Sequence, residues 1–247
     1  MVPLMIETMA KKLEEVPGLP PKLVKWQVFG KQFHTICSGG AYLPPAMIDL
    51  FDRYGITILQ GYGMTECSPV ISTTVSWNIR KESVGQLLPN CEAKTVDKEL
   101  WVRGSSVMMG YYKMPEETAQ TLEDGWLKTG DLGYADEDGF VYLTGRKKNL
   151  IITKNGENVS PEELENKIGE HRLVQEILVR EKDGVIEAEI YPDYDYIKKK
   201  RIKDVSAALQ QVIDEYNQGA PAYKKVYSLK VRETEFEKTT SRKIKRF

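Results

Sequence analysis

The hexapeptide G-Y-G-M-T-E, which begins at Gly61, combines side chains that could serve a bound nucleotide. Gly61 and Gly63 would let the backbone approach a ligand closely, and Tyr62 could stack on a flat ring. Thr65 and Glu66 could serve a phosphate group and its Mg²⁺. An ordinary strand and turn with a buried tyrosine is the alternative, because short motifs also occur by chance.

Asp131 lies between two glycines in the apolar segment W-L-K-T-G-D-L-G. One interpretation makes its carboxylate the acceptor for two neighbouring hydroxyls of a sugar. The other makes it a turn aspartate that bonds to its own backbone. The segment by itself is typical of both.

Residues 145–165 join a basic cluster, a β-rich run and a second glycine turn to the start of a helix. Ser160 is expected to cap this helix, with Pro161 at its first position. The basic cluster alone is typical of a solvated surface. The polar, basic end of the chain, residues 237–247, is likewise typical of a solvated end.

The first two glycine-rich turns follow predicted strands. Residues 33–37 form a buried strand that ends at Ser38-Gly39-Gly40, and residues 56–59 form the next strand, followed by Gly61 and Gly63. Between them, residues 44–54 form an amphipathic helix that Gly55 stops. Alternation of strand, glycine turn and helix is typical of a parallel α/β sheet, which binds ligands at the carboxyl ends of its strands.

The remaining chain has a different character. Met5, Ile6, Met9 and Leu13 recur at helical spacing, and the stretch that contains Pro17, Gly18, Pro20 and Pro21 is expected to stop this helix. Short alternating runs punctuated by glycines between residues 70 and 145 predict a small barrel or curled sheet. An α+β pattern follows, and its predicted elements are a helix over 161–168, strands over 173–180 and 185–191, a long polar helix over 197–216 and a strand over 226–231.

Charge changes sign along the chain. Residues 1–146 carry 14 basic and 18 acidic side chains, whereas residues 147–247 carry 21 and 18. A domain boundary is therefore expected near residue 147. The 247 residues as a whole have a formal charge of −1, which argues against an electrostatic nucleic-acid partner.

Several classes of site are disfavoured by the residue counts. The three cysteines, Cys37, Cys67 and Cys91, form no C-x-x-C pair, so a disulfide framework or zinc knuckle is not expected. Only two histidines are present, which disfavours a histidine-based triad. No apolar run is long enough to span a membrane and no secretory signal is found, so a reducing cytoplasm is the expected compartment.

Six motifs, in order, resemble the core motifs of the AMP-forming acyl-adenylate ligases, and most closely those of bacterial long-chain fatty-acid–CoA ligases. They are G-Y-G-M-T-E, E-L-W-V-R-G, G-W-L-K-T-G-D-L-G, G-R-K-K-N-L-I-I, N-G-E-N-V-S-P-E-E-L-E and K-T-T-S-R-K-I-K-R. The resemblance runs from about Ser38 to Arg246. It implies an α/β fold, with the end of a parallel α/β sheet, a small β-barrel-like subdomain and a small α+β C-terminal lid domain.

The resemblance also implies a role for individual residues. Its nucleotide-binding positions correspond to Ser38, Gly39, Gly40, Ala41, Gly61, Tyr62, Gly63, Asp131 and Arg146. Its catalytic positions correspond to Lys243, Glu66 and Thr65, with Glu66 also holding Mg²⁺. Lys148 matches the hinge of the lid, and Lys154, Gly156 and Glu157 match the loop that faces CoA.

The implied enzyme joins a carboxylic acid, expected to be a long-chain fatty acid, to AMP with release of pyrophosphate, and then transfers the acyl group to CoA. ATP, Mg²⁺ and CoA are the implied cofactor and co-substrates. Residues 1–146 would be the C-terminal part of the large AMP-binding domain, and 147–247 the mobile lid. Peripheral contact with a membrane is compatible with this reading.

One family feature is absent from the sequence. The 247 residues contain no Ser/Thr/Gly-rich run ending in Pro-Lys, which is the family's phosphate-binding loop. The expected partners are therefore the carboxylic acid, ATP and CoA, together with a missing N-terminal part of the same chain. The alternatives are an adenylation domain that loads a carrier protein, and a non-catalytic remnant that binds AMP.

Overall fold

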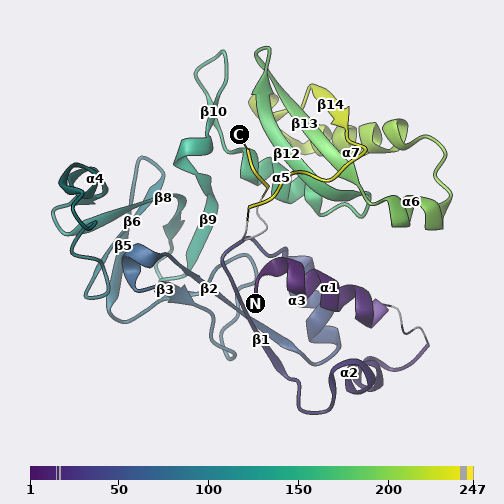
Figure 1. Ribbon diagram of the computed structural model, residues 1–247, viewed down its shortest axis with the longest axis horizontal. Coiled ribbons are helices and arrows are strands. Elements are labelled where there is room, and N and C mark those ends of the chain that lie inside the picture. The colour runs from purple at the N-terminus through teal and green to yellow at the C-terminus, as the bar shows by residue number, and fades with distance from the viewer. Residues whose placement is uncertain (15, 17, 240–243, 247) are drawn as a thin grey trace. The chain divides into compact units, whose positions relative to one another are not determined.

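The computed structural model describes residues 1–14, 16, 18–239 and 244–246. The chain divides into two compact units, Met1–Leu143 and Thr144–Phe247 (Figure 1). The change of charge sign placed a boundary between residues 146 and 147.

In its described residues, the first unit contains four α-helices, a short 3-10 helix and most of the strands. Its helices are α1 (Pro3–Glu14), α2 (Pro21–Phe29), α3 (Pro45–Arg53), η1 (Thr65–Cys67) and α4 (Pro115–Thr121). Its strands are β1 (Thr35–Gly39), β2 (Thr57–Gly63), β3 (Val70–Thr73), β4 (Gln86–Leu87), β5 (Cys91–Val96), β6 (Glu99–Gly104), β7 (Leu122–Glu123) and β8 (Trp126–Ala135), and β9 (Val141–Arg146) continues into the second unit.

The first sheet has the order β1-β2-β3-β4 and contains the predicted parallel pair. β1 and β2 run parallel with Ser38 opposite Gln60, and α3 packs against β2. Apolar side chains of α1, α3 and these strands pack together into a core. It includes Ile6, Leu13, Ile36, Phe51, Ile56 and Ile58. Figure 1 shows α1, α2 and α3 grouped beside β1 and β2.

The helical spacing of Met5, Ile6, Met9 and Leu13 is confirmed, since all four lie on α1; Ile6 and Leu13 are buried, Met9 packs against the same core and Met5 is exposed. Two other local predictions in this part of the chain need correction. The proline-rich stretch does not only stop a helix, since Pro21 begins α2. β2 does not end before Gly61, because β3 pairs with it in antiparallel fashion up to Gly63.

The second sheet of the first unit is the predicted curled sheet. Its order is β5-β6-β8-β7, with β9 pairing to β8 off this path. β5 and β6 form a hairpin, and β8 is a long strand that supplies Asp131. Buried side chains of β5, β6, β8 and β9 pack with Cys67 and Ile71 into one core.

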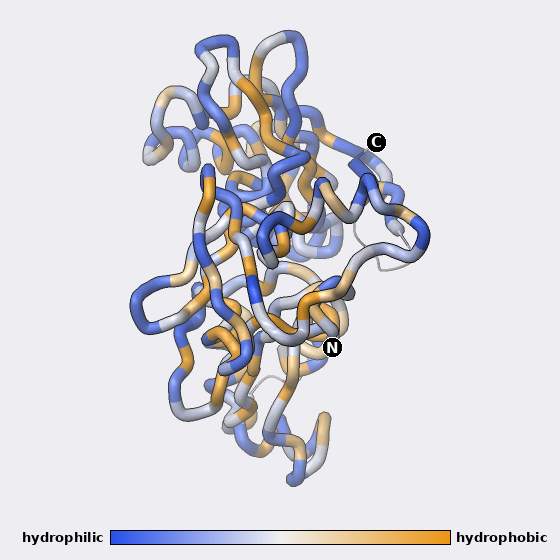
Figure 2. The backbone as a smooth tube through the Cα atoms, turned by 90° about the vertical axis from the view of Figure 1, so that its left-hand side faces the viewer, coloured by the Kyte–Doolittle hydropathy of each residue, from blue (hydrophilic) through white to orange (hydrophobic). Residues whose placement is uncertain are grey.

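The second unit is an α+β domain. Its helices are η2 (Lys147–Asn149), α5 (Pro161–Gly169), α6 (Tyr194–Lys200), α7 (Val205–Gly219) and η3 (Ala222–Lys224). Its strands are β10 (Ile151–Ile152), β11 (Asn158–Val159), β12 (Val174–Lys182), β13 (Val185–Pro192) and β14 (Ser228–Val231). α5 and α7 pack on the sheet β12-β13-β14, and Figure 2 shows hydrophobic strand centres between hydrophilic turns.

Two predictions for the second unit were wrong in detail. The long helix over 197–216 is two helices, because Arg201 adopts a left-handed conformation (φ 55°) and Asp204 caps a new helix by accepting a hydrogen bond from the Ala207 amide at 2.9 Å. Ser160 occupies the cap position of α5, but its hydroxyl donates to the Thr144 carbonyl (2.7 Å) instead of capping the helix.

The mixed α/β architecture with a curled second sheet is confirmed. Among the described residues, no helix is both long and apolar enough to cross a membrane.

Candidate nucleotide site and lid residues

The carboxyl ends of β1 and β2 bring two predicted segments together. Gly39 pairs with Gly61 across the parallel strands, so the turn that begins at Ser38 lies next to the hexapeptide that begins at Gly61. A β-carbon on Gly39 would stand 3.0 Å from the Gly61 carbonyl oxygen, which is tighter than normal contact. Gly40 has φ +87°, and both it and Ala41 are exposed beyond the strand end.

Ser38 is a polar group in an apolar position at this edge. It is 5% exposed, and its hydroxyl has no hydrogen-bond partner among the described residues. A buried hydroxyl without a partner costs free energy unless something else bonds to it. Ser38 is therefore suited to a hydrogen bond with a group that enters from outside the strand.

The chain must turn sharply after β2 to reach η1. A β-carbon on Gly63 would lie 1.8 Å from the Pro69 carbonyl oxygen, so only glycine fits this position. Thr65 and Glu66 follow on η1, where Thr65 is exposed and Glu66 half-buried. The glycine thus explains how the threonine and glutamate are presented directly beside the strand end.

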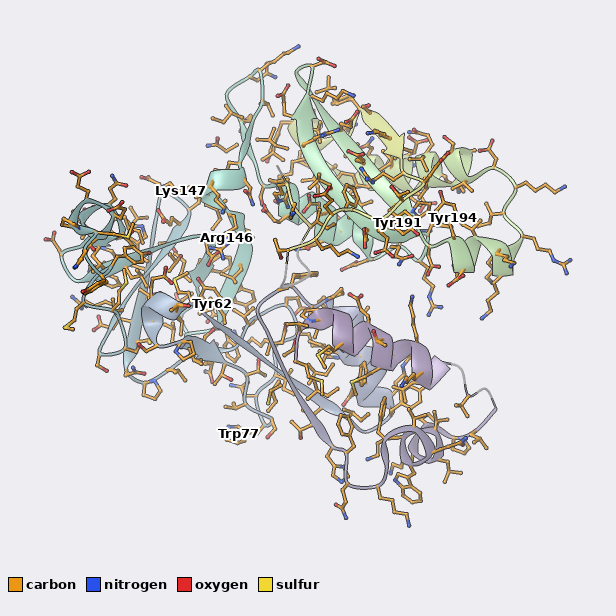
Figure 3. The ribbon with its side chains drawn as sticks, in the orientation of Figure 1. Tyr62, Trp77, Arg146, Lys147, Tyr191 and Tyr194 are labelled. Carbon is orange, nitrogen blue, oxygen red and sulfur yellow. The ribbon has the colours of Figure 1, made fainter. Side chains whose placement is uncertain are left out.

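Tyr62 and Asp131 are joined by a hydrogen bond. The Tyr62 hydroxyl donates to Asp131 Oδ2 at 2.6 Å, although the two residues are 69 positions apart in sequence. Asp131 is 5% exposed on β8, and Tyr62, labelled in Figure 3, is half-buried near the end of β2. The contact places an aromatic ring and a carboxylate, the two groups expected at a nucleoside, side by side.

The surroundings of Asp131 hold its backbone in place. The Asp131 amide donates to Thr129 Oγ1 at 3.1 Å, and the Thr129 hydroxyl donates to the Leu100 carbonyl at 2.6 Å. The Gly130 amide donates to Glu99 Oε1 at 2.9 Å, with Gly130 at φ +69°. Thr129 and Glu99 hold the backbone around Asp131, and their roles were not predicted from the sequence. Both lie inside the motifs E-L-W-V-R-G and G-W-L-K-T-G-D-L-G.

Glu66 has a partner that the sequence did not single out. The Tyr111 hydroxyl donates to Glu66 Oε1 at 2.8 Å, and the Met108 amide donates to the Glu66 carbonyl at 2.8 Å. The hydrogen bond to the carboxylate, with a smaller effect of burial, raises the pKa of Tyr111 above its usual 10.0. Tyr111 therefore stays neutral and holds one carboxylate oxygen of Glu66.

The groups around Glu66 fit a magnesium ion bound mainly by phosphate. The described residues contain no cluster of three or more histidine, cysteine, aspartate or glutamate side chains that could hold a metal. Mg²⁺ needs no such cluster when it keeps water molecules and substrate phosphates as ligands, because one carboxylate is then sufficient. Glu66 is such a carboxylate.

The predicted residues of the second unit lie on its first segments. Arg146 ends β9, and Lys148 is exposed on η2 directly after it. The loop between β10 and β11 is a tight turn in which the Gly156 amide donates to the Thr153 carbonyl (2.8 Å), with Gly156 at φ +78°. Arg146 and Lys148 themselves are separated by one residue, Lys147.

The loop residues Lys154 and Glu157 are both exposed. A β-carbon on Gly184, in the turn between β12 and β13, would meet Lys154 Cε at 1.9 Å. The Lys154 side chain therefore lies across this turn, and the glycine there gives it room.

Lys243, the predicted tail lysine, lies outside the described residues. The chain on either side of it is attached to the second unit: Lys238 and Ile244 form an antiparallel bridge, and the Lys245 amide donates to the Glu237 carbonyl at 2.9 Å. Arg246 reaches α5 and donates to Glu165 Oε1 at 2.9 Å. Among the described residues of this segment, Lys238 and Arg246 are therefore held by ion pairs to the second unit, with Glu176 and Glu165 respectively, unlike the residues of a wholly solvated end.

Two family models match this chain. The model of the AMP-binding enzyme matches residues 1–112, and the model of the AMP-binding enzyme C-terminal domain matches residues 148–247. A long-chain-fatty-acid–CoA ligase of Bacillus subtilis (strain 168) is 40% identical over 156 residues, which are 58% of this chain and 28% of that protein. A 2-succinylbenzoate–CoA ligase of Bacillus pumilus is 34% identical over 184 residues, 70% of this chain and 35% of that protein.

Solved structures of a CoA synthetase also match this chain. The o-succinylbenzoate CoA synthetase MenE of Bacillus subtilis, in complex with the acyl-adenylate intermediate OSB-AMP, matches 99% of this chain and 49% of its own, with a TM-score of 0.77 and 28% identity. The same enzyme in complex with ATP and magnesium ion has a TM-score of 0.75. This chain spans about half of that structure and about a third or less of the two curated relatives. With both family models matched in order along it, the chain belongs to the AMP-binding enzyme family.

Proposed function

We propose that this chain is part of an AMP-forming acid–CoA ligase that activates a long-chain fatty acid. The enzyme would form acyl-AMP with release of pyrophosphate and then transfer the acyl group to CoA. The observation that carries the proposal is the pairing of Tyr62 with Asp131 at the strand-end edge. It supplies a ring to stack on a base and a carboxylate to accept sugar hydroxyls within one hydrogen bond of each other.

Under this proposal the nucleoside lies over the edge formed by β1 and β2. The residues that would surround it in the first unit are Ser38, Gly39, Gly40, Ala41, Gly61, Tyr62, Gly63 and Asp131. The unpartnered Ser38 hydroxyl supports this placement, because a bound nucleotide would offer it a hydrogen bond. Asp131 would accept both ribose hydroxyls once ligand binding displaces or shares the Tyr62 hydroxyl.

The phosphate side of the site would be formed by η1. Thr65 would donate to a phosphate oxygen, and Glu66, held by Tyr111, would supply a ligand to Mg²⁺. Mg²⁺ neutralises phosphate charge that repels the incoming carboxylate. Arg146 and Lys243 would add positive charge at the α-phosphate, where charge develops during adenylation.

The second unit would act as the lid of the enzyme. Lys148 would be its hinge, since it is exposed on a short turn immediately after β9. The loop that contains Lys154, Gly156 and Glu157 would face the site during thioester formation, when Lys243 has withdrawn. Glycine at 156 would leave room for the pantetheine arm.

Support for a fatty acid comes from the curated relative of Bacillus subtilis, which is 40% identical over the aligned region. The matched 2-succinylbenzoate ligases show that the same family architecture also serves other acids. The N-terminal part of the ligase, with its phosphate-binding loop, would be needed for the complete reaction. The activity of the whole enzyme is therefore tested with an extended chain.

The binding half of the proposal is tested by AMP titration of the chain in a calorimeter. Asp131→Ala should weaken AMP binding by about 1–3 kcal/mol, because the ribose hydroxyls lose their acceptor. Asp52→Ala, at an exposed aspartate of α3, is the matched control and should bind AMP as the unaltered chain does. Equal AMP affinity in all three proteins would contradict the assigned site.

The catalytic half is tested by fatty-acid-dependent ATP–pyrophosphate exchange. The 247-residue chain is compared with a version extended upstream, using acids of different chain length. Exchange by the extended version identifies the ligase and its acid, and competition between CoA and a carrier protein identifies the acceptor. Exchange by neither version would refute the ligase and leave a nucleotide-binding remnant.

A further inference from the structure

Two cysteines that are distant in sequence share one hydrogen-bonding partner in the core of the first unit. Cys67 Sγ lies 3.5 Å from Ser106 Oγ, and Cys91 Sγ lies 3.7 Å from the same oxygen. The two sulfur atoms are therefore no more than about 7 Å apart. Both thiols are free, and 24 positions separate them in the chain.

The two thiols differ in access to solvent. Cys67 is fully buried at the end of η1, whereas Cys91, at the start of β5, is 8% exposed. An oxidant from solvent therefore reaches Cys91 first, with Cys67 placed behind it as a second thiol.

We propose that Cys67 and Cys91 form a reversible disulfide when the protein meets a peroxide. The Cys91 sulfur attacks one oxygen of hydrogen peroxide, the O–O bond breaks, and Cys91 becomes a sulfenic acid with release of water. The Cys67 sulfur then attacks the Cys91 sulfur, the S–O bond breaks, and the hydroxide leaves with the Cys67 proton as a second water. Two thiols are oxidised by two electrons, and one peroxide is reduced to two waters.

Ser106 has a specific part in the second step. Its hydroxyl can donate a hydrogen bond to whichever sulfur carries negative charge, and it lies within reach of both. A hydrogen bond from this hydroxyl to the attacking Cys67 sulfur would stabilise the negative charge on that sulfur during the second step. A disulfide requires the sulfurs to approach to about 2.05 Å, so both side chains must rotate toward each other past this hydroxyl.

The crosslink would act on the segment that carries the candidate phosphate-side residues. Cys67 directly follows Glu66 on η1, and Cys91 begins a strand of the curled sheet. Oxidation would therefore tie η1 to β5. This property does not depend on the proposed ligase activity, because the bond is measured on the chain itself.

The test is peroxide treatment of the 247-residue chain, followed by alkylation in denaturant and peptide mass mapping. We expect the Cys67 and Cys91 peptides to become linked, with the loss of two hydrogens, and to separate again on treatment with a dithiol. Cys37 is exposed and serves as an internal control that should not join this link. Full alkylation of Cys67 and Cys91 after peroxide treatment would refute the proposal.

Variants separate the two steps. In Cys67→Ala, the sulfenic acid at Cys91 should persist and be trapped by dimedone, whereas in Cys91→Ala the buried Cys67 should stay reduced. Ser106→Ala should slow the crosslink several-fold while leaving Cys37 alkylation unchanged. Trapped sulfenic acid at Cys67 and none at Cys91 would overturn the order of steps. The mapping of the unsubstituted chain remains decisive if a core variant fails to fold.

Discussion

At the scale of single residues, the hydroxyl of Tyr111 determines how Glu66 is presented. Its hydrogen bond of 2.8 Å occupies one carboxylate oxygen and sets the direction of the other. Tyr112, the next residue, is 85% exposed. The pair therefore offers a test in which the same chemical change is made at a partly buried contact and at a solvated tyrosine.

Tyr111→Phe should raise the Mg²⁺ concentration at which the effect of Mg²⁺ on nucleotide binding is half-maximal. A hydrogen bond to a charged group contributes about 1.5–3 kcal/mol, so its loss should raise the half-saturating Mg²⁺ concentration by roughly tenfold or more. AMP and ATP binding are measured across a Mg²⁺ series. Tyr112→Phe should leave the curve unchanged, and an identical response of both variants would count against a positioning role for Tyr111.

The pair formed by Tyr62 and Asp131 shows the same principle within the nucleoside side of the site. Neither residue has a local reason to meet the other, since they stand on different sheets of the first unit. The hydrogen bond keeps the Asp131 carboxylate oriented while the Thr129 hydroxyl holds its amide. A preoriented acceptor loses less conformational entropy when a ligand binds.

At the scale of elements, the hexapeptide contains two glycines with different roles. A β-carbon at Gly63 would stand 1.8 Å from the Pro69 carbonyl oxygen and 2.9 Å from Val70 Cα. A β-carbon at Gly61 would meet the Ser72 carbonyl oxygen at 3.7 Å, an ordinary contact. The turn from β2 into η1 therefore depends on Gly63, whereas β2 itself has room at Gly61.

Gly63→Ala should destabilise the first unit by about 1–3 kcal/mol or more, because the new methyl group forces the backbone apart. Gly61→Ala should cost less than about 1 kcal/mol, since it adds a side chain in an allowed position. Urea unfolding followed by tryptophan fluorescence measures both. Similar losses in the two variants would show that the close approach at Pro69 is not what constrains this turn.

The sheet of the second unit contains buried acids on its central strand. Glu187 and Glu189 are each 2% exposed on β13. Arg180 lies 3.1 Å from a Glu187 oxygen and 3.0 Å from a Glu189 oxygen, and Arg232 is 2.7 Å from Glu189. Lys182 and Lys230 lie close to Glu187 and Glu189 respectively. Four cations therefore surround the two carboxylates: two on β12, one on β14 and one just after β14.

At the scale of the whole molecule, these carboxylates make stability depend on pH. Burial opposes their ionisation, but hydrogen bonds from the surrounding groups outweigh it, from Arg180 and Lys182 at Glu187 and from Lys230 and Arg232 at Glu189. These bonds hold the pKa of both acids below 4.5. A pKa that is lower in the folded chain means stability that is present above pH 4.5 and is lost as pH falls through the folded pKa.

The unfolding free energy of the second unit should therefore fall steeply as the pH drops below about 4.5. Glu187→Gln should lower stability at pH 7 and flatten this acid limb, because one of the titrating groups is gone. Glu170→Gln, at an exposed glutamate after α5, should retain the full slope. Denaturant unfolding at several pH values provides the comparison, and an unchanged slope in Glu187→Gln would contradict the assignment.

Part of this molecule followed from local sequence patterns alone. The parallel pair β1 and β2, the helix between them and the curled sheet were predicted because strand alternation, helical spacing and glycine turns are local properties of the chain. The same holds for the position of the glycine-rich segments at strand ends. Residue types and spacing alone also indicated the hexapeptide, Asp131 and the segment after residue 145 as candidate functional positions.

Contacts between distant segments were decided only by the tertiary structure. The hydrogen bonds from Tyr62 to Asp131 and from Tyr111 to Glu66, and the contacts of Cys67 and Cys91 with Ser106, join segments that are distant in sequence. No local preference encodes these contacts. The break between α6 and α7 was missed for a related reason. Helical spacing continues through Arg201, whereas in the structure α6 ends there with a left-handed residue whose amide donates to the Lys198 carbonyl at 3.2 Å, and α7 begins after the cap at Asp204.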